Sequence, residues 1–122
     1  MTKPLALVLY ERLMPGSQLV NRLQDLGYRT ETVSDPKLLV GHAEKVKPML
    51  VIADLEPAGA NVSDALSRLK ENSATLHLPI IAFCADHSTD LPNKAKAATL
   101  VVTDTAIATH LPLFLDQALQ VD

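Results

Sequence analysis

Four short runs of apolar residues, each about as long as one β-strand, constrain the fold of this chain more than any other feature. They are residues 5–10 (LALVLY), 49–53 (MLVIA), 78–85 (LPIIAFCA) and 99–103 (TLVVT). A strand with one face in water alternates apolar and polar residues, whereas an unbroken apolar run is typical of a strand buried on both faces. The runs therefore predict a parallel sheet that is covered by helices on both sides.

The segment after the first run has the pattern of a helix followed by an edge strand. Residues 15–27 repeat leucine at helical spacing, with Pro15 suited to the first turn and Gly27 to the position just past the end. Residues 28–33 (YRTETV) are more polar, and we expect them to form a short strand at one edge of the sheet.

A second helix is predicted over residues 34–48. Asp35 is its expected N-cap, and Pro36 is its expected first residue. Gly41 weakens the prediction, since glycine lowers helix propensity. The residues expected on its inward face are Leu38, Leu39, His42 and Val46.

Two more helices are predicted in the second half of the chain. The first covers residues 62–72, with an inward face of Val62, Ala65, Leu66 and Leu69. The second covers residues 109–120 and is expected to begin near Thr109 or His110. This closing helix has more apolar residues than one buried face needs, namely Leu111, Leu113, Phe114, Leu115 and Leu119. The surplus suggests a homodimer or a docking surface for a partner protein.

Strands and helical segments alternate along the chain, which predicts an α/β fold: a doubly wound, five-stranded parallel sheet with helices on both faces. A length of 122 residues is typical of a single domain, so we expect one domain over residues 1–122. Hydrophobic residues make up 48% of the chain but aromatic residues only 3%, which means that the core must be mainly aliphatic.

Charge and cysteine content exclude several functions. The formal net charge is −3 and the lysines and arginines are scattered, so we expect no binding to nucleic acid. The only cysteine cannot form an internal disulfide, and the first apolar run is too short for a signal peptide or a membrane span. These features predict a cytoplasmic protein with no membrane association. Because the sequence has no glycine-rich phosphate loop, no Cys-x-x-Cys pair and no recognisable Ser-His-Asp set, we expect no enzymatic activity.

Several polar residues follow the predicted strands, at the sheet edge where parallel folds of this kind bind their ligands. If the first and third strands are neighbours, Asp54 and Glu11 should lie within a few ångströms of one another. Together with Glu56, they are candidate ligands for Mg²⁺, which prefers oxygen ligands. Asp54 could also be a nucleophile toward a phosphoryl group, or it could simply cap the turn that follows.

The stretch KPMLVIADLEPAG, together with LPIIAFCA and the order of the elements, resembles the receiver domain of two-component response regulators. The resemblance covers nearly the whole chain, and it implies a flavodoxin-like fold with Asp54 as the phosphoacceptor. It also implies Mg²⁺ as the cofactor and a histidine kinase or a downstream effector as the protein partner.

The residues at the ends of three predicted strands depart from the pattern of that family. Tyr10 and Glu11 stand where receivers usually have two acidic residues that organise the metal, and Cys84 stands where they have Ser or Thr. Thr103 and Asp104 stand where they have a lysine that neutralises the phosphoryl charge, usually followed by proline. We therefore predict an atypical receiver-like domain with an incomplete phosphorylation site that acts through protein–protein interaction. Two alternatives remain open: a conventional Mg²⁺-dependent receiver, and a flavodoxin-like enzyme or ligand-binding protein.

Overall fold

The computed structural model describes residues 4–10, 13–55, 59–84 and 98–119, of which residues 13–16, 59–61 and 119 are described by their backbone alone. The chain forms a five-stranded parallel sheet with the strand order β2-β1-β3-β4-β5. The strands are β1 (Leu5–Leu9), β2 (Arg29–Val33), β3 (Leu50–Asp54), β4 (Ile80–Cys84) and β5 (Leu100–Thr103). The predicted doubly wound sheet is confirmed.

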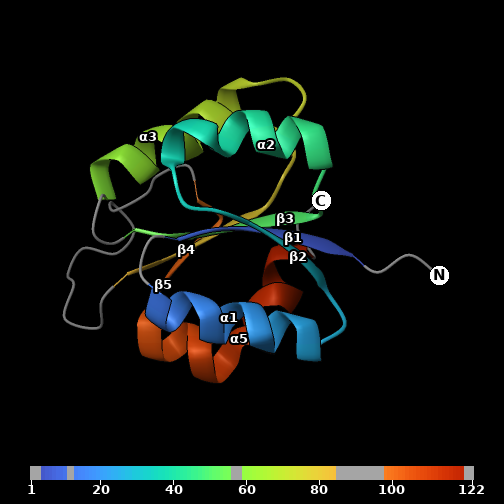
Figure 1. Ribbon diagram of the computed structural model, residues 1–122, viewed down its shortest axis with the longest axis vertical. Helices are drawn as coiled ribbons and strands as arrows, with labels where there is room; N and C mark the ends of the chain where they lie inside the picture. The colour runs from blue at the N-terminus through green and yellow to red at the C-terminus, as the bar shows by residue number, and fades with distance from the viewer. Residues whose placement is uncertain (1–3, 11–12, 56–58, 85–97, 120–122) are drawn as a thin grey trace.

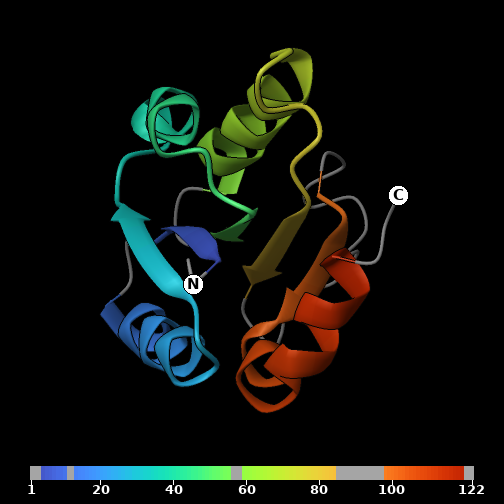
Figure 2. The same cartoon turned by 90° about the vertical axis from the view of Figure 1, so that its right-hand side faces the viewer.

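Two layers of helices enclose the sheet (Figure 1). The helices are α1 (Leu13–Asp25), α2 (Leu39–Val46), α3 (Gly59–Glu71) and α5 (Asp104–Leu119), with a short 3₁₀ helix η1 (Pro36–Leu38) before α2. Figure 2 shows α2 and α3 on one face of the sheet and α1 and α5 on the other. None of the helices within the described residues is long and apolar enough to cross a membrane.

Burial follows the sequence in four of the strands but not in β5, which lies at an edge of the sheet and has only Val102 buried. Every residue of β1, β3 and β4 is buried, as their unbroken apolar runs predict. In β2 only Val33 is buried, and this polar strand lies at an edge of the sheet as expected. Because β1 and β3 are neighbours although they are not consecutive in the chain, the strand order reverses between them.

The first two helices agree with the sequence in their ends but only partly in the faces that they bury. Pro15 lies in the first turn of α1, and Gly27 has the left-handed φ of +92° that favours glycine after a helix. The Asp35 carboxylate accepts a hydrogen bond from the Lys37 N–H at 3.0 Å, which makes Asp35 the N-cap of η1. Leu38, however, is 61% exposed.

The exposure of Leu38 corrects the predicted inward face of the second helix. Residues 36–38 form a 3₁₀ turn with about three residues per turn, so the spacing of an α-helix does not apply across the junction with α2. The fully buried residues of α2 are Leu39 and Ala43, while His42 and Val46 are half-buried. In α3, by contrast, all four residues predicted to face inward are buried: Val62, Ala65, Leu66 and Leu69.

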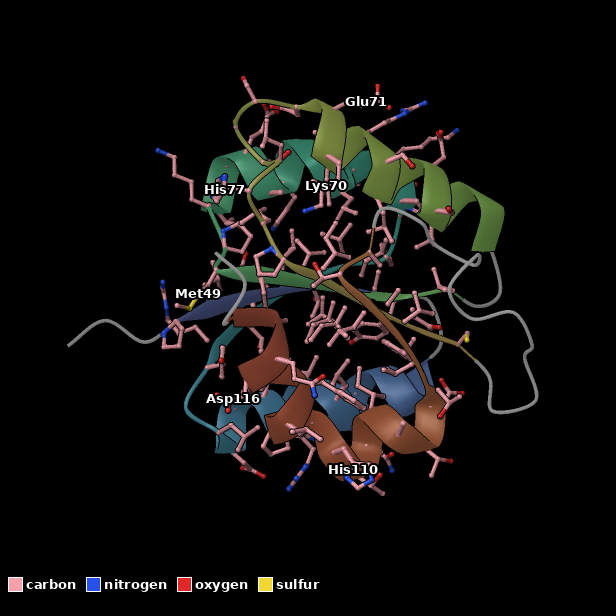
Figure 3. All side chains as sticks on the ribbon, turned by 180° about the vertical axis from the view of Figure 1, so that it is seen from behind. Met49, Lys70, Glu71, His77, His110 and Asp116 are labelled. Atoms are coloured by element: carbon pink, nitrogen blue, oxygen red, sulfur yellow. The ribbon has the colours of Figure 1, made fainter. Side chains whose placement is uncertain are left out.

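The last helix begins earlier than predicted. It starts at Asp104, directly after β5, and the predicted start coincides with a kink at His110, where φ is −121° and ψ is 25°. Pro112 follows the kink, and since proline has no N–H it cannot donate to the carbonyl of Ala108 four residues before. His110 is exposed, and Figure 3 shows it on the outer side of α5.

Most of the large apolar side chains in α5 pack into the core. Leu111 and Leu115 are buried and Phe114 packs against them as a partly buried residue, whereas Leu113 is 53% exposed. The side chain of Leu119 lies outside the described residues. Among the described side chains of α5, Leu113 is therefore the large apolar residue that remains exposed.

The core consists of two clusters, one on each face of the sheet. Consecutive strand residues belong to opposite clusters because side chains alternate between the two faces. In β4, Phe83 belongs to the cluster beneath α1 and α5, and Cys84 to the cluster beneath α2 and α3. The same alternation determines which way the residues of the candidate site point.

A lysine clamp supports the loop that enters β4. The Lys70 Nζ donates hydrogen bonds to the carbonyl oxygens of Leu78 at 2.7 Å and Leu76 at 3.2 Å. The buried Thr75 hydroxyl donates to the Leu69 carbonyl at 2.7 Å. Figure 3 shows Lys70 between α3 and the sheet. The bonds fix the loop to the end of α3 and so position β4.

Candidate functional site

Asp54 ends the central strand β3, and its side chain is only 1% exposed. It pairs in register with Phe83 of β4, and the Leu55 N–H donates to the Phe83 carbonyl at 2.8 Å, which extends the pairing past Asp54. Because register partners in a parallel sheet share a face, Asp54 is directed to the α1–α5 side, as Phe83 is. Asp54 thus occupies the carboxyl edge of the sheet next to the point where the strand order reverses.

Tyr10 is the neighbour of Asp54 on the adjacent strand. Leu9 pairs in register with Ala53, so Tyr10 follows at the level of Asp54. The Tyr10 N–H donates to the Val33 carbonyl at 3.0 Å, and its half-buried side chain packs against the α1–α5 cluster. The Tyr10 side chain therefore lies on the same face of the sheet as Asp54.

The predicted metal ligands are only partly within the described residues. Glu11 and Glu56 lie outside them, so the expected closeness of Glu11 to Asp54 stays a prediction. Within the described residues no group of three His, Cys, Asp or Glu side chains could hold a metal ion. Asp54 alone offers one carboxylate, which by itself does not make a Mg²⁺ site.

Cys84 is a packing residue in this structure. It is fully buried in the α2–α3 cluster, and its Sγ lies 3.6 Å from the Val102 carbonyl, to which the thiol donates. A thiol closed to solvent and directed at the backbone of β5 behaves as a small hydrophobic residue with a weak donor. Cys84 is the last residue of β4.

Thr103 has a role that the predicted strand and helix boundaries missed. It pairs in register with Cys84 and ends β5, and α5 begins at the next residue, Asp104. The Thr103 Oγ1 accepts a hydrogen bond from the Ala106 N–H at 3.2 Å, which is the geometry of a helix N-cap. Asp104 places a carboxylate in the first turn, where the helix dipole favours negative charge. A Thr-Asp pair is itself an N-terminal helix signal, and it could have revealed this boundary in the sequence.

Comparison with known proteins identifies the fold. No protein-family model and no curated protein sequence matches the chain. Among solved structures, the chain is similar to the chemotaxis response regulator CheY4 of Vibrio cholerae, with 20% identity, a TM-score of 0.82, and coverage of 96% of this chain and 99% of that one. It is also similar to a putative response regulator from Chloroflexus aurantiacus, with 17% identity, a TM-score of 0.82, and coverage of 98% and 100%.

A third similar structure is the signal receiver domain of an HD domain-containing protein from Pseudomonas fluorescens, with 18% identity and a TM-score of 0.81. The alignment covers 98% of this chain and 89% of that receiver domain. The chain therefore has the flavodoxin-like fold of response regulator receiver domains. At these identities the similarity concerns the fold, and the chemistry of the site has to be argued from the residues themselves.

Proposed function

We propose that this chain is a receiver-like signalling domain that acts by binding protein partners and whose phosphorylation site at Asp54 is incomplete. One observation supports this most strongly: the hydroxyl of Thr103 caps α5, at the strand end where receivers have a lysine. The side chain after it, Asp104, is acidic. The chain is thus a binding module rather than an enzyme in this proposal.

The physical argument concerns the charge of a phosphorylated Asp54. A phosphoryl group is stabilised by hydrogen bonds from charged donors, each of which contributes about 1.5–3 kcal/mol. The end of β5 has a hydroxyl that already accepts the Ala106 N–H, followed by a carboxylate. The end of β4 has a thiol directed at Val102. Neither strand end supplies the strong donor that the charge requires.

The position of Asp54 favours one competing function, a conventional receiver. A nearly buried carboxylate at the end of the central strand is where the resembled family has its phosphoacceptor. In that case Mg²⁺ would be held by Asp54 with Glu11 and Glu56, and a histidine kinase would be the partner. In the proposed function the partner is an effector protein or a second copy of the chain, and Leu113 on α5 is the exposed apolar residue that such a contact would cover.

Phosphorylation of a repaired variant separates the two functions. The repaired variant carries Tyr10→Asp, Cys84→Thr, Thr103→Lys and Asp104→Pro, which return an acid, a hydroxyl and an ammonium group to the strand ends. Both proteins are incubated with Mg²⁺ and acetyl phosphate, and phosphorylation is measured by intact mass. The matched control is the repaired variant with Asp54→Asn, which removes the acceptor.

We expect a phosphoryl group on the repaired variant, and none on the natural chain or the control. Equal phosphorylation of the natural and repaired proteins would mean that the substitutions are tolerated and that the chain is a conventional receiver. A folded repaired variant that remains unphosphorylated would show that these four residues do not account for the loss. Amide NMR spectra with beryllofluoride, which mimics a phosphoryl group on aspartate, provide a second readout.

A further inference from the structure

A cavity of about 350 Å³ is lined by residues of α1 and α5 and by Phe83 of β4. The two helices cover the same face of the sheet (Figures 1 and 2). The volume is within the range of small-molecule sites, which is about 300–1,000 Å³. Within the described part of the chain, the cavity is lined by Gln18, Leu19, Asn21, Arg22, Phe83, Ile107 and Ala108.

The inner part of the cavity is apolar. Leu19, Phe83 and Ile107 form its floor, and all three are buried members of the α1–α5 cluster. Ala108 forms a wall on α5 and is exposed, so a small side chain stands at a position where a larger one would fill the space. Such a floor suits a short hydrocarbon chain or ring, because removing apolar surface from water is favourable.

Three polar side chains, one of them positively charged, also line the cavity, whose surface is otherwise mainly apolar. Gln18, Asn21 and Arg22 line it from exposed positions on α1. Among the described residues, no carboxylate forms an ion pair with Arg22, and no acidic side chain lines the cavity. A guanidinium group pairs with a carboxylate through two parallel hydrogen bonds, and two neighbouring amides can add further donors.

We propose that this cavity binds a small apolar carboxylate, with its hydrocarbon part over Phe83 and its carboxylate on Arg22. The inference goes beyond the proposed function, and it does not depend on whether Asp54 accepts a phosphoryl group. Because Phe83 is the register partner of Asp54, the ligand would lie beneath the candidate phosphoacceptor on the same face of the sheet.

The probe for the test is octanoate, added to the full ¹⁵N-labelled chain and followed by amide NMR. Octan-1-ol and octylammonium have the same hydrocarbon chain with a neutral or a positive head, and hexanoate has the same head with a shorter chain. We expect saturable shifts at residues 18–22 and 106–109, and weaker binding of octylammonium and octan-1-ol. Hexanoate should bind on the order of tenfold more weakly, because it buries two fewer methylene groups.

Two variants test the two parts of the cavity. Ala108→Phe fills the apolar part at an exposed position and should weaken octanoate binding at least tenfold. Arg22→Gln should weaken octanoate several-fold and leave octan-1-ol unchanged. Arg68→Gln is the matched control, because Arg68 is an exposed arginine on α3 that pairs with Asp64 on the opposite face. Circular dichroism verifies that each variant is folded.

Three results would overturn the proposal. One is the absence of saturable shifts at millimolar octanoate, or their location outside α1 and α5. Another is equal affinity for octanoate and octan-1-ol that Arg22→Gln does not change, because the cavity would then have no preference for an anion. The third is self-association of the chain in sedimentation equilibrium that Ala108→Phe abolishes, because a second copy would then occupy the cavity.

Discussion

Removal of the Thr103 hydroxyl tests whether this residue caps α5. In Thr103→Val the β-branched shape and the strand propensity are retained, and only the acceptor for the Ala106 N–H at 3.2 Å is lost. Loss of an N-cap costs about 0.5–2 kcal/mol, and a half-buried position with one hydrogen bond corresponds to the middle of that range, about 1 kcal/mol. Thr103→Ser retains the hydroxyl and should lose less than about 0.5 kcal/mol.

Urea unfolding measures the free energy of unfolding of all three proteins. With a slope of about 2 kcal/mol per molar urea, the Val variant should unfold at a urea concentration lower by about 0.5 M, and the Ser variant near the natural value. The melting temperature of the Val variant should be lower by about 4 °C. If Val is as stable as Thr, the hydroxyl does not cap the helix. If Ser is as destabilised as Val, the methyl group of Thr103, and not its hydroxyl, is responsible.

Two further predictions concern residues with shifted pKa values. Lys70→Met removes the two hydrogen bonds to the carbonyls of Leu76 and Leu78 and should cost about 1 kcal/mol of unfolding free energy in urea titrations. Burial lowers the pKa of Lys70 in the folded state, so the unfolded state binds this proton more tightly. The free energy of unfolding should therefore rise with pH just below the ordinary lysine pKa. The Lys70→Met variant should not show this rise. Burial, and secondly the charge of Asp116, raise the pKa of Tyr28, so stability should fall once the pH exceeds the ordinary tyrosine pKa of about 10. In an ultraviolet titration Asp116→Asn should lower the pKa of Tyr28 but leave it raised, and a complete return to the ordinary value would contradict burial as the main cause.

The inner strands and the third helix could be predicted because the local pattern of apolar residues was enough to define each of them. The inner strands are unbroken apolar runs, and such runs have few alternatives once they are bounded by turn residues. For α3, four apolar residues at i, i+3, i+4 and i+7 define one face, and the structure buries all of them. In both cases the sequence pattern and the tertiary packing agree.

The errors occur where two elements join without a loop. The apolar spacing predicts that Leu38 lies on the inward α-helical face, but Leu38 lies in a 3₁₀ turn, which changes the direction of its side chain. The start of α5 was placed at Thr109 or His110, because Pro112 marks a first turn, whereas the helix runs through a kink from Asp104. Side-chain roles are harder still: the thiol of Cys84 bonds to Val102, a neighbour on another strand that local sequence does not reveal.

The two residues at the end of β5 and the start of α5, Thr103 and Asp104, also stabilise the helix that follows them. A lysine at position 103 would add a positive charge, but it could not accept the Ala106 N–H, so the cap of α5 would be lost. Replacement of Asp104 would also remove a carboxylate that stabilises the first helical turn by about 0.3–1 kcal/mol, although proline itself suits that position. If the proposed function is right, phosphoryl chemistry and helix stability place different demands on the same two residues. The repaired variant should consequently be less stable by about 1 kcal/mol than the double variant Tyr10→Asp, Cys84→Thr, which retains Thr103 and Asp104. A repaired variant that accepts the phosphoryl group and is as stable as the double variant would show that the cap and the chemistry are independent.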